Sequence, residues 1–442
     1  MEAKGREKQI INERLKKIND LRKKGVNPYP YKFDKKNSVE ECLNLKSGSK
    51  VKTAGRLVSK RDIGKIAFCN LQDGFGKIQI VFQNKETPEE VFKFFRKYLD
   101  AGDFVGVEGK IFKTKTKQTS ILVEKIELLS KSILPLPEKW HGLQNKEEKY
   151  RKRYLDLIIN PEVKEIFEKR SKIIDSLRNF LKEKGFLEVE TPVLQPIAGG
   201  AIAKPFKTHY NAYNTDVYLR IAPELYLKKL LIGGFEKVFE FSKCFRNEGV
   251  DWSHNPEFTN LEFYEAYVDY NQMMNLVEDL ICQAAKDVNY KKIKIKKPFK
   301  KIEFEKITKG KMTDEAFKEA IKKIKEPTFV INHPLDISPL AKKNNEKTVQ
   351  RFQLIINGIE VVNAFSELND PLDQEQRFKE QAKKKEEKHE FDKDFVEALK
   401  HCMPPAGGVG IGIDRLVMIF TEKKSIREIL LFPFMKPEGN KN

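Results

Sequence analysis

One segment in the second half of the chain combines a permanent positive charge, carboxylates and aromatic rings at close spacing. It comprises FRNEG at 245–249 and HNPEFTNLEFYEAY at 254–267. Arg246 carries a guanidinium, which can hold a carboxylate or a phosphate through two parallel hydrogen bonds. Glu248 lies two residues further along a predicted strand and so shares its face. Glu248 can accept a hydrogen bond from an adenine amine, and Phe258 can stack on a purine.

Acidic side chains also interrupt apolar sequence in two places. Glu262 and Tyr264 are two residues apart, so they lie on one face of a predicted strand. The run IEVVNAFSELND at 359–370 is otherwise apolar. Because buried carboxylates need partners, we expect this strand to face a cationic ligand. Its candidate residues are Glu360, Asn363, Phe365 and Glu367.

A glycine-rich run, GGVGIGIDR at 407–415, resembles a loop that cradles phosphate. It lacks the Lys-Ser/Thr pair of a P-loop, and its spacing is not that of a dinucleotide fingerprint. Arg415 begins a predicted helix, where a phosphate would meet both a guanidinium and the positive helix end. An ordinary ion-pair network would account for any one of the three clusters. Three clusters in one domain favour a functional site.

The elements that must position these clusters form a large α+β domain. A predicted helix runs from Asn160-Pro161 to about residue 184, with its apolar residues on one face. The run FLEVETPVL at 186–194 alternates as a strand. Long, irregular spacers between the strands favour an antiparallel sheet flanked by helices over repeating βαβ units. Further strands are predicted at 216–221, 236–245, 257–267, 352–366 and 408–413, and helices at 224–232, 271–286, 371–388 and 414–420.

Residues 50–130 show short β-rich runs separated by turn signals. Three strands, a helix and two strands follow one another, which is the order of an OB-type barrel. Small barrels of this kind hold single-stranded nucleic acid on aromatic rings over a basic groove. Arg61, Phe68 and Gln79 have the right chemistry, although composition alone favours a barrel-core position for Phe68. The strands are predicted at 51–58, 66–72, 77–83, 104–112 and 120–129, and the helix at 88–99.

Composition limits which kinds of partner and which cellular compartment fit this chain. The 442 residues carry 84 Lys+Arg against 65 Asp+Glu, and the formal net charge of +19 suits a polyanion partner. No apolar run approaches the roughly 18–20 residues of a membrane span, and the N-terminus has no secretory h-region. The five cysteines are scattered and form no CxxC, which argues against a zinc site or a disulfide framework. We therefore expect a cytoplasmic protein without a membrane partner.

These patterns divide the chain into four segments. Residues 1–49 form an extension with a charged helix, residues 50–130 the barrel, residues 131–150 a linker, and residues 151–437 the α+β domain. The lysine-rich stretch 291–301 is predicted to be a solvated loop or an edge strand. The helix is predicted at 7–25, with an apolar stripe of Ile10, Ile11, Leu15, Ile18 and Leu21.

Longer stretches of the sequence are similar to a known family over nearly the whole chain. PEVKEIFEKRSKIIDSLRNFLKEKGFLEVETPVLQP resembles class II motif 1, FRNEGVDWSHNPEFTNLEFYEAY motif 2, and GGVGIGIDRLVMIF motif 3. RIAPELYLKKL and NAFSELNDPLDQ add to the likeness. The sequence thus resembles a class II lysyl-tRNA synthetase of the bacterial type. The resemblance implies an OB-fold anticodon-binding barrel followed by a class II catalytic domain.

The resemblance also implies a two-step reaction that consumes ATP. The carboxylate of L-lysine attacks the α-phosphate to give lysyl-adenylate and pyrophosphate, and the terminal ribose hydroxyl of tRNA(Lys) then takes the lysyl group. By motif match, Arg246 bridges the lysine carboxylate and the α-phosphate, and Glu248 and Arg415 complete the catalytic set. ATP also contacts His254, Asn255, Phe258 and Glu360. The implied lysine-binding residues are Gly200, Glu224, Glu262, Tyr264, Asn363, Phe365 and Glu367.

Further partners follow from the same resemblance. Arg61, Phe68 and Gln79 match positions that read a uridine-rich anticodon. The motif 1 helix would meet a second copy, so a homodimer is implied. Glu360 resembles a ligand of Mg²⁺, an ion that prefers hard oxygen donors. Gln353 stands where the family usually has the second carboxylate of that metal site.

The sequence departs from the family pattern at several positions. Ser253 and its neighbour Trp252 are unusual in motif 2, and Gln118 replaces a glutamate that usually contacts the anticodon. Segment 290–330 is shorter than in relatives. Together with Gln353, these departures support a rival hypothesis, a catalytically weakened paralogue that binds tRNA or makes a regulatory nucleotide. A second rival, a ligase that attaches lysine to a protein, is disfavoured by the barrel at 50–130.

Overall fold

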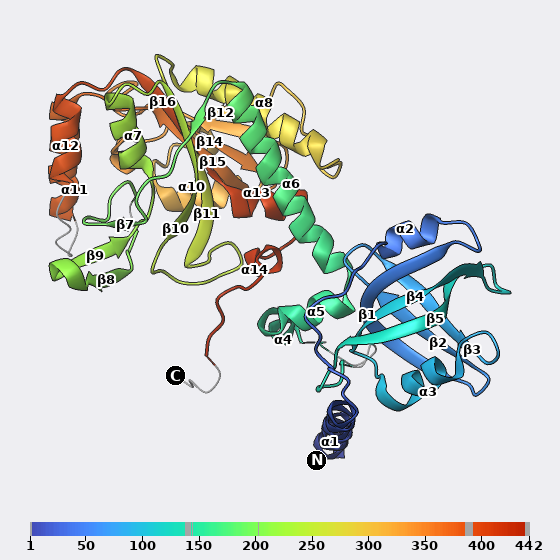
Figure 1. Cartoon of the computed structure of the whole chain (residues 1–442). Coiled ribbons are helices and arrows are strands. Elements are labelled where there is room, and N and C mark those ends of the chain that lie inside the picture. Colours follow the sequence, from blue (N-terminus) through green and yellow to red (C-terminus); the bar gives the residue numbers. More distant parts are fainter. Residues whose placement is uncertain (1, 138–142, 144, 202, 385–391, 438–442) are drawn as a thin grey trace. The chain divides into compact units, whose positions relative to one another are not determined.

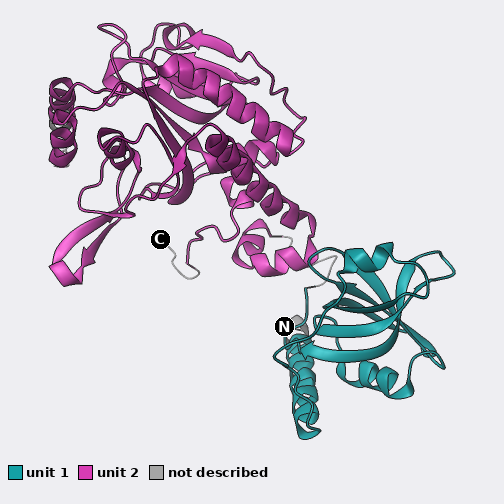
Figure 2. Cartoon of the chain, turned by 45° about the horizontal axis from the view of Figure 1, so that its top comes forward, with its two compact units in different colours: residues 1–142 teal, residues 143–442 magenta. Residues whose placement is uncertain are grey.

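The computed structural model describes residues 2–137, 143, 145–201, 203–384 and 392–437, and its elements are labelled in Figure 1. The chain divides into two compact units, Met1–Gly142 and Leu143–Asn442 (Figure 2). Of the predicted linker 131–150, residues 138–142 and 144 lie outside the described residues, and helix α4 (Lys146–Arg151) begins within it. Each unit has its own hydrophobic core.

Unit 1 is built on a closed five-stranded barrel. Its residues alternate between buried and outward-facing along the strands, as expected where one face of a strand packs on a core. Helix α3 (Glu89–Tyr98) follows the third strand, and its Phe92 and Phe95 stack on Phe82 in the barrel core. The strands, in the spatial order β1-β2-β3-β5-β4, are β1 (Lys50–Asp62), β2 (Ile66–Gln72), β3 (Lys77–Gln83), β4 (Phe104–Lys113) and β5 (Thr119–Ser130).

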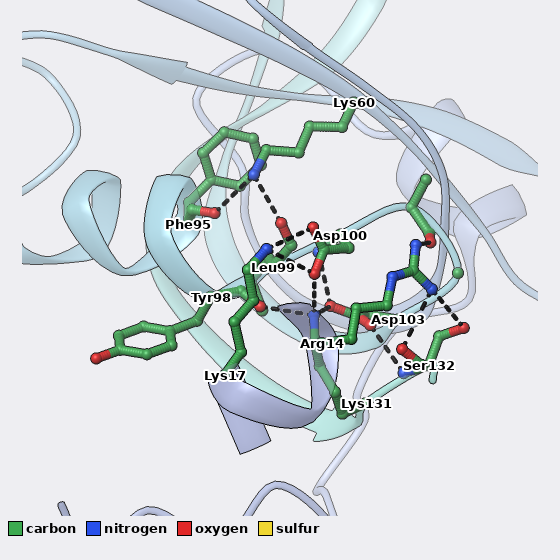
Figure 3. A network of polar contacts seen from close by, with 12 residues as sticks. Arg14, Lys17, Lys60, Phe95, Tyr98, Leu99, Asp100, Asp103, Lys131 and Ser132 are labelled. Atoms are coloured by element: carbon green, nitrogen blue, oxygen red, sulfur yellow. Dashed lines mark hydrogen bonds and ion pairs between the residues drawn. The ribbon is translucent and has the colours of Figure 1, made fainter. Parts of the chain in front are cut away.

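Helix α1 (Glu2–Lys23) is attached to the barrel largely by polar contacts (Figure 3). Leu15, predicted to belong to its apolar stripe, is 40% exposed, and Arg14 is buried instead. Arg14 donates to the backbone carbonyls of Ala101 and Leu134. The stripe prediction was wrong at this turn because carbonyl groups of the barrel supply the acceptors that a buried guanidinium needs.

A fully buried lysine lies at the centre of this network (Figure 3). Lys131 Nζ lies 2.5 Å from Asp100 Oδ2 and 2.7 Å from Asp103 Oδ2. It also donates to the carbonyl of Tyr98 at 2.6 Å. The Asp103 carboxylate accepts in turn from the backbone N–H of Ser132 at 2.9 Å. Lys131 therefore ties the end of β5 to the turn that follows α3.

Unit 2 is organised around an eight-stranded sheet. Its central strands are antiparallel, and each edge carries one parallel pair, β12 with β13 and β6 with β10. The predicted antiparallel sheet is therefore present, and the lysine-rich stretch runs into its edge strand. In spatial order the strands are β12 (Lys300–Glu303), β13 (Thr328–Ile331), β14 (Arg351–Ile356), β15 (Ile359–Ser366), β16 (Ala406–Gly412), β11 (Glu257–Ala266), β10 (Lys237–Phe245) and β6 (Leu187–Glu188).

Helices pack against both faces of this sheet (Figure 1). The larger core lies between the sheet and helices α6 (Glu162–Glu183), α8 (Tyr270–Asp287) and α13 (Ile413–Phe420). A smaller core on the other face includes side chains of α7 (Glu224–Ile232) and α12 (Lys393–Lys400). The second face is thus only partly covered by helices, which leaves room for a site.

Two strand predictions need correction. The predicted strand 186–194 forms only β6 and β7 (Leu194–Gln195), because Pro192 has no N–H to offer a ladder. The predicted strand 352–366 is two strands, β14 and β15, joined at Asn357 and Gly358. Both turn residues have positive φ, 52° and 76°, the conformation that an Asn-Gly hairpin turn requires.

Smaller elements complete the chain. β7, β9 (Thr215–Leu219) and β8 (Lys207–Tyr210) form a separate three-stranded sheet. Residues 385–388 of the helix predicted at 371–388 lie outside the described residues. The remaining elements are α2 (Val39–Asn44), α5 (Arg153–Ile159), η1 (Asn211–Tyr213), α9 (Phe304–Ile307), α10 (Asp314–Ile321), η2 (Leu335–Ile337), α11 (Pro371–Lys384) and α14 (Ile426–Ile429).

None of the helices in the described residues is long and apolar enough to cross a membrane. The five cysteines are free thiols. Burial raises the pKa of Cys69 and of Cys244 to about 12, so neither thiol is activated as a nucleophile.

Substitution of Asp103 tests the buried network of unit 1. Asp103→Ala leaves Lys131 with one carboxylate, and removing one partner of a buried ion pair costs about 3–5 kcal/mol. We expect the free energy of unfolding of unit 1 to fall by about 3 kcal/mol in urea denaturation. The control Asp34→Ala removes an exposed pair with Lys36 and should leave the transition unchanged. Equal midpoints for the two variants would contradict the assignment.

Candidate active site

A cavity of about 260 Å³ opens on the less covered face of the unit 2 sheet. Strand alternation decides which side chains reach it. In β11, Leu261 and Phe263 lie in the large core, whereas Asn260, Glu262 and Tyr264 line the cavity. The predicted site residues that line it are Gly200, Glu224, Arg246, Glu248, His254, Asn255, Phe258, Glu262, Tyr264, Glu360, Asn363, Phe365 and Arg415.

The glycine run forms the floor of this cavity. It is strand β16, which confirms the strand predicted at 408–413, and the likeness of the run to a phosphate-cradling loop does not hold. Val409 and Ile411 belong to the core, and the alternating Gly408, Gly410 and Gly412 line the cavity. Because these positions have no side chain, side chains from the neighbouring strands β11 and β15 can lie over the floor.

One end of the cavity is acidic and buried. Glu262 is 5% exposed, and its carboxylate accepts from Asn260 Nδ2 at 2.8 Å and from the Tyr264 hydroxyl at 3.0 Å. Burial, followed by the nearby charge of Glu224, raises the pKa of Glu262 to about 8. Among the described residues no cationic side chain pairs with it. Glu262 therefore holds a proton near neutral pH until a cation arrives.

The predicted residue Glu367 lies behind the floor, immediately after β15. It is 1% exposed and forms an ion pair with Lys228. Lys228 Nζ also lies 2.7 Å from Glu224 Oε1. The sequence analysis missed Lys228, although one signal was available. Lysine four residues after glutamate in a short apolar helix is the spacing of an i,i+4 ion pair.

The other end of the cavity is cationic. Arg246 follows β10, which ends at Phe245, so Arg246 and Glu248 do not lie on a strand as predicted. The backbone N–H of Arg246 donates to the carbonyl of Pro256 at 2.9 Å. Its guanidinium lies over the ring of Phe258, 4.9 Å from the centroid, and its buried Nε has no hydrogen-bond partner among the residues that the structure describes. A buried donor without a partner is prepared to receive an anion.

Arg415 approaches the same end from helix α13. It donates to the carbonyl of Glu360 at 3.2 Å and lies 3.2 Å from Nε2 of His254. His254 Nδ1 lies 2.8 Å from Asp251 Oδ2, so the imidazole is held from both sides. Two arginines, one histidine and the cavity wall thus form a surface suited to phosphate.

Strand β15 supplies two polar groups that regular alternation would separate. Glu360 and Asn363 are three residues apart, yet both line the cavity. Ile355 pairs with Glu360 and Leu354 with Val362, so β15 contains a β-bulge with one extra residue. The bulge brings the two side chains to the same face. Asn363 Oδ1 accepts from Arg351 Nε at 2.8 Å, which fixes the amide.

The metal-binding capacity of the site rests on few ligands. Glu360 is a cavity carboxylate, 3.9 Å from Arg415, and Gln353 lies nearby in an adjoining cavity of about 620 Å³ that Glu360 also lines. The described residues hold no group of three or more His, Cys, Asp or Glu side chains that could bind a metal alone. Oxygen donors of this kind fit a Mg²⁺ ion that takes its other ligands from substrate phosphates and water.

The barrel of unit 1 carries a second candidate surface. Arg61 and Phe68 pair across strands β1 and β2, and both line a groove of about 660 Å³ with Gln79 and Gln118. Ala67 and Cys69 point into the barrel, so Phe68 faces outward. Composition alone favoured a core position for Phe68, and the strand alternation overturns it.

Both units match known families. Residues 145–436 match the model of tRNA synthetases class II (D, K and N), and residues 51–129 match that of the OB-fold nucleic acid binding domain. An OB barrel joined to an antiparallel sheet with this cavity is the architecture of a class II tRNA synthetase.

Curated relatives narrow the class. The chain is 46% identical to the lysine–tRNA ligase of Pelotomaculum thermopropionicum, across 99% of this chain and 97% of the relative. It is 46% identical to that of Carboxydothermus hydrogenoformans, across 97% and 98%, and 44% identical to that of Thermotoga maritima, across 98% and 97%. The chain belongs to the lysine–tRNA ligase family.

The floor of the cavity gives a prediction on stability. A Cβ added at Gly408 would overlap Glu367 Oε1 and the Tyr264 ring, and both side chains are buried. We expect Gly408→Ala to lower the free energy of unfolding of unit 2 by about 1–3 kcal/mol, the usual cost of overpacking. The control Gly233→Ala introduces contacts no closer than 3.4 Å. The prediction fails if both variants melt at the temperature of the parent.

Proposed function

We propose that the chain attaches L-lysine to tRNA(Lys) through a lysyl-adenylate, with release of pyrophosphate and AMP. The observation that supports this most strongly is the polarity of the cavity. Buried carboxylates line one end and two arginines line the other. A diamino acid fits this arrangement with its side-chain ammonium at the acidic end and its carboxylate toward Arg246.

In the first step, a lysine carboxylate oxygen bonds to the α-phosphorus of ATP, and the bond to the pyrophosphate oxygen breaks. Arg246 is placed to hold both anionic groups, since its Nε has no partner within the described residues. Arg415 and His254 then face the outer phosphates, with Glu248 and Asn255 toward the adenosine. The side chains position and neutralise the reactants and form no covalent bond with them.

Mg²⁺ bound by Glu360, with the Gln353 amide beside it, would neutralise charge on the phosphates. In the second step, a ribose hydroxyl of the tRNA bonds to the lysyl carbonyl carbon, and AMP leaves with the electron pair of the broken bond. The cavity of about 620 Å³ shares Gly200, Arg246 and Glu360 with the first. It provides a route for the end of the acceptor to reach the adenylate.

Selectivity for lysine follows from the cost of leaving buried charge without a partner. A neutral side chain of similar length would leave the acidic end uncompensated, whereas an ammonium satisfies it. Gly200 and Glu224 lie where the α-amino group would be held, and Asn363 near the carboxylate. Tyr264 and Phe365 form the walls around the side chain. The carboxylates that meet its ammonium are Glu262 and Glu367.

The proposal extends to the other partners. The barrel groove with Arg61, Phe68 and Gln79 takes the anticodon, since aromatic rings beside basic residues bind single-stranded bases. We infer a homodimer through the motif 1 region, and a cytoplasmic location, which suits a chain with five free thiols.

Lysine-dependent exchange of pyrophosphate into ATP tests the first step, and charging of purified tRNA(Lys) tests the second. We expect both reactions, with no exchange when norleucine replaces lysine. Absence of exchange at saturating Mg²⁺ would reject the proposal and favour the weakened paralogue.

The raised pKa of Glu262 makes lysine binding depend on pH. The bound ammonium needs the ionised carboxylate, so below about pH 8 binding must displace the proton that Glu262 holds. We expect the affinity of the parent for lysine to rise as pH rises toward 8, measured by titration calorimetry. Glu262→Gln should weaken binding by about 2 kcal/mol at pH 8 and reduce this slope. A parent affinity that is flat from pH 6 to pH 8 would contradict the role of Glu262.

The barrel groove gives a prediction that separates the two steps. Phe68→Ala removes a stacking surface worth about 1–3 kcal/mol per base. We expect the KM for tRNA(Lys) to rise at least about fivefold, with pyrophosphate exchange unchanged. The control Phe75→Ala removes an aromatic side chain that is 70% exposed outside the groove. If both variants charge tRNA(Lys) equally well, the assignment of Phe68 to the anticodon-binding surface is rejected.

A further inference from the structure

Lys228 is the most deeply buried cation near the candidate active site. Its relative exposure is 0%, and its ammonium contacts Glu224 on its own helix and Glu367 after β15. The rings of Phe365 and Phe395 lie 5.3 Å and 5.9 Å from Nζ. Lys228 lines neither cavity, whereas its partner Glu224 lines both, so the cation contacts a cavity carboxylate without entering the cavity itself.

Stability is a poor reason to keep such a group. Removing an ammonium from water costs several kcal/mol, and buried ion pairs are often no more stable than apolar residues of the same volume. A lysine in this place therefore needs another explanation, and the neighbouring site supplies one. Both of its carboxylate partners belong to the set that we propose to bind lysine.

The charges at the acidic end match a specific class of ligand. Two carboxylates, Glu224 and Glu367, contact one internal ammonium, Lys228, and the charge of Glu224 also acts on a third buried carboxylate, Glu262. When all are ionised, two negative charges remain without a partner. A diamino acid brings two ammonium groups, so it neutralises this end completely. An amino acid with a neutral side chain brings one.

We propose that Lys228 is a positioning residue for lysine recognition, a built-in counter-cation that holds the carboxylates of Glu367 and Glu224 in place before the substrate binds. The inference rests on the proposed function and deepens it. It explains how two buried carboxylates can lie close together beside the cavity. Among the described residues Glu262 has no such cation, so only Glu367 has the rise of its pKa opposed by a neighbouring ammonium.

Every element packed around the ammonium enters this argument. Helix α7 contributes Glu224, and the segment after β15 contributes Glu367. In the described part of the chain, helix α12 contributes the uncharged Phe395, and β11 contributes Tyr264, whose hydroxyl donates to Glu262. Burial lowers the pKa of Lys228, but the charges of Glu224 and Glu367 outweigh it, so that the pKa is raised and the ammonium stays protonated. Burial raises the pKa of Glu367 to about 8, and the charge of Lys228 opposes this rise without cancelling it.

The experiment measures lysine binding to the full-length protein by titration calorimetry. Buffers of different ionisation enthalpy give the number of protons released on binding. Lys228→Met keeps the length of the side chain and removes its charge. We expect it to weaken lysine binding at least about tenfold at pH 7.5 and to increase proton release, because without the opposing charge of Lys228 a larger fraction of Glu367 is protonated in the free protein. The KM for ATP should stay within twofold.

The adjacent lysine provides a matched control. Lys229 pairs with Asp394 at the surface of the same helix, and its side chain is not part of the cavity. Lys229→Met should leave lysine affinity and proton release as in the parent. A double-mutant cycle adds a second measure. In a Glu367→Gln background there is no charge for Lys228 to hold there, so Lys228→Met should cost clearly less than in the parent.

The outcomes are distinguishable. If the parent binds no lysine, the proposed function itself fails. If the parent binds lysine and Lys228→Met binds it within twofold, only the inference fails. Weaker binding with unchanged proton release and additive effects in the cycle would show a purely structural role and would also overturn it. Loss of affinity with greater proton release and non-additivity supports it, as does partial recovery by Lys228→Arg.

Discussion

A carboxylate removed from water must find a positive charge or take up a proton, and this constraint governs the organisation of unit 2. Three carboxylates are gathered at one end of the cavity, where Glu262 and Glu367 are almost completely buried. One solution is internal, because Lys228 pairs with Glu224 and Glu367. The other is left to the ligand, because among the described residues Glu262 accepts hydrogen bonds from an amide and a phenol and pairs with no cation. The acidic end is therefore partly neutralised and partly prepared for a cation.

The rest of the fold makes room for this arrangement. The alternating glycines of β16 leave a floor without side chains, over which residues of β11 and β15 can lie. The bulge in β15 turns Glu360 and Asn363 to the same face. At the opposite end, Arg246 comes from the loop after β10 and Arg415 from helix α13. On the proposed function, lysine is selected at one end of this cavity and its carboxylate is activated at the other.

Much of the architecture could be predicted from local pattern. The five barrel strands and helix α3 follow period-two and helical spacing closely, and the polar clusters converge on one cavity because each lies on a regular element or directly beside one. Local pattern failed where a distant partner decided the outcome. Arg14 is buried because its guanidinium donates hydrogen bonds to the backbone carbonyls of Ala101 and Leu134. The strand predicted at 352–366 is a hairpin, although its Asn-Gly turn was a readable signal. Phe68 faces outward because Ala67 and Cys69 fill the interior.

The sequence by itself determined the order of the elements, the family, and the residue types available for chemistry, since these depend on periodicity and on short motifs. Only the tertiary structure decided which carboxylates are buried together, that Glu367 lies behind Gly408, and that Lys228 stands between Glu224 and Glu367. The physical reason is that burial and electrostatic pairing depend on residues far apart in the chain. The packing of a helix against a sheet brings Glu224 and Glu367 to the same ammonium. No spacing of residues in the sequence predicts that these two carboxylates lie close together.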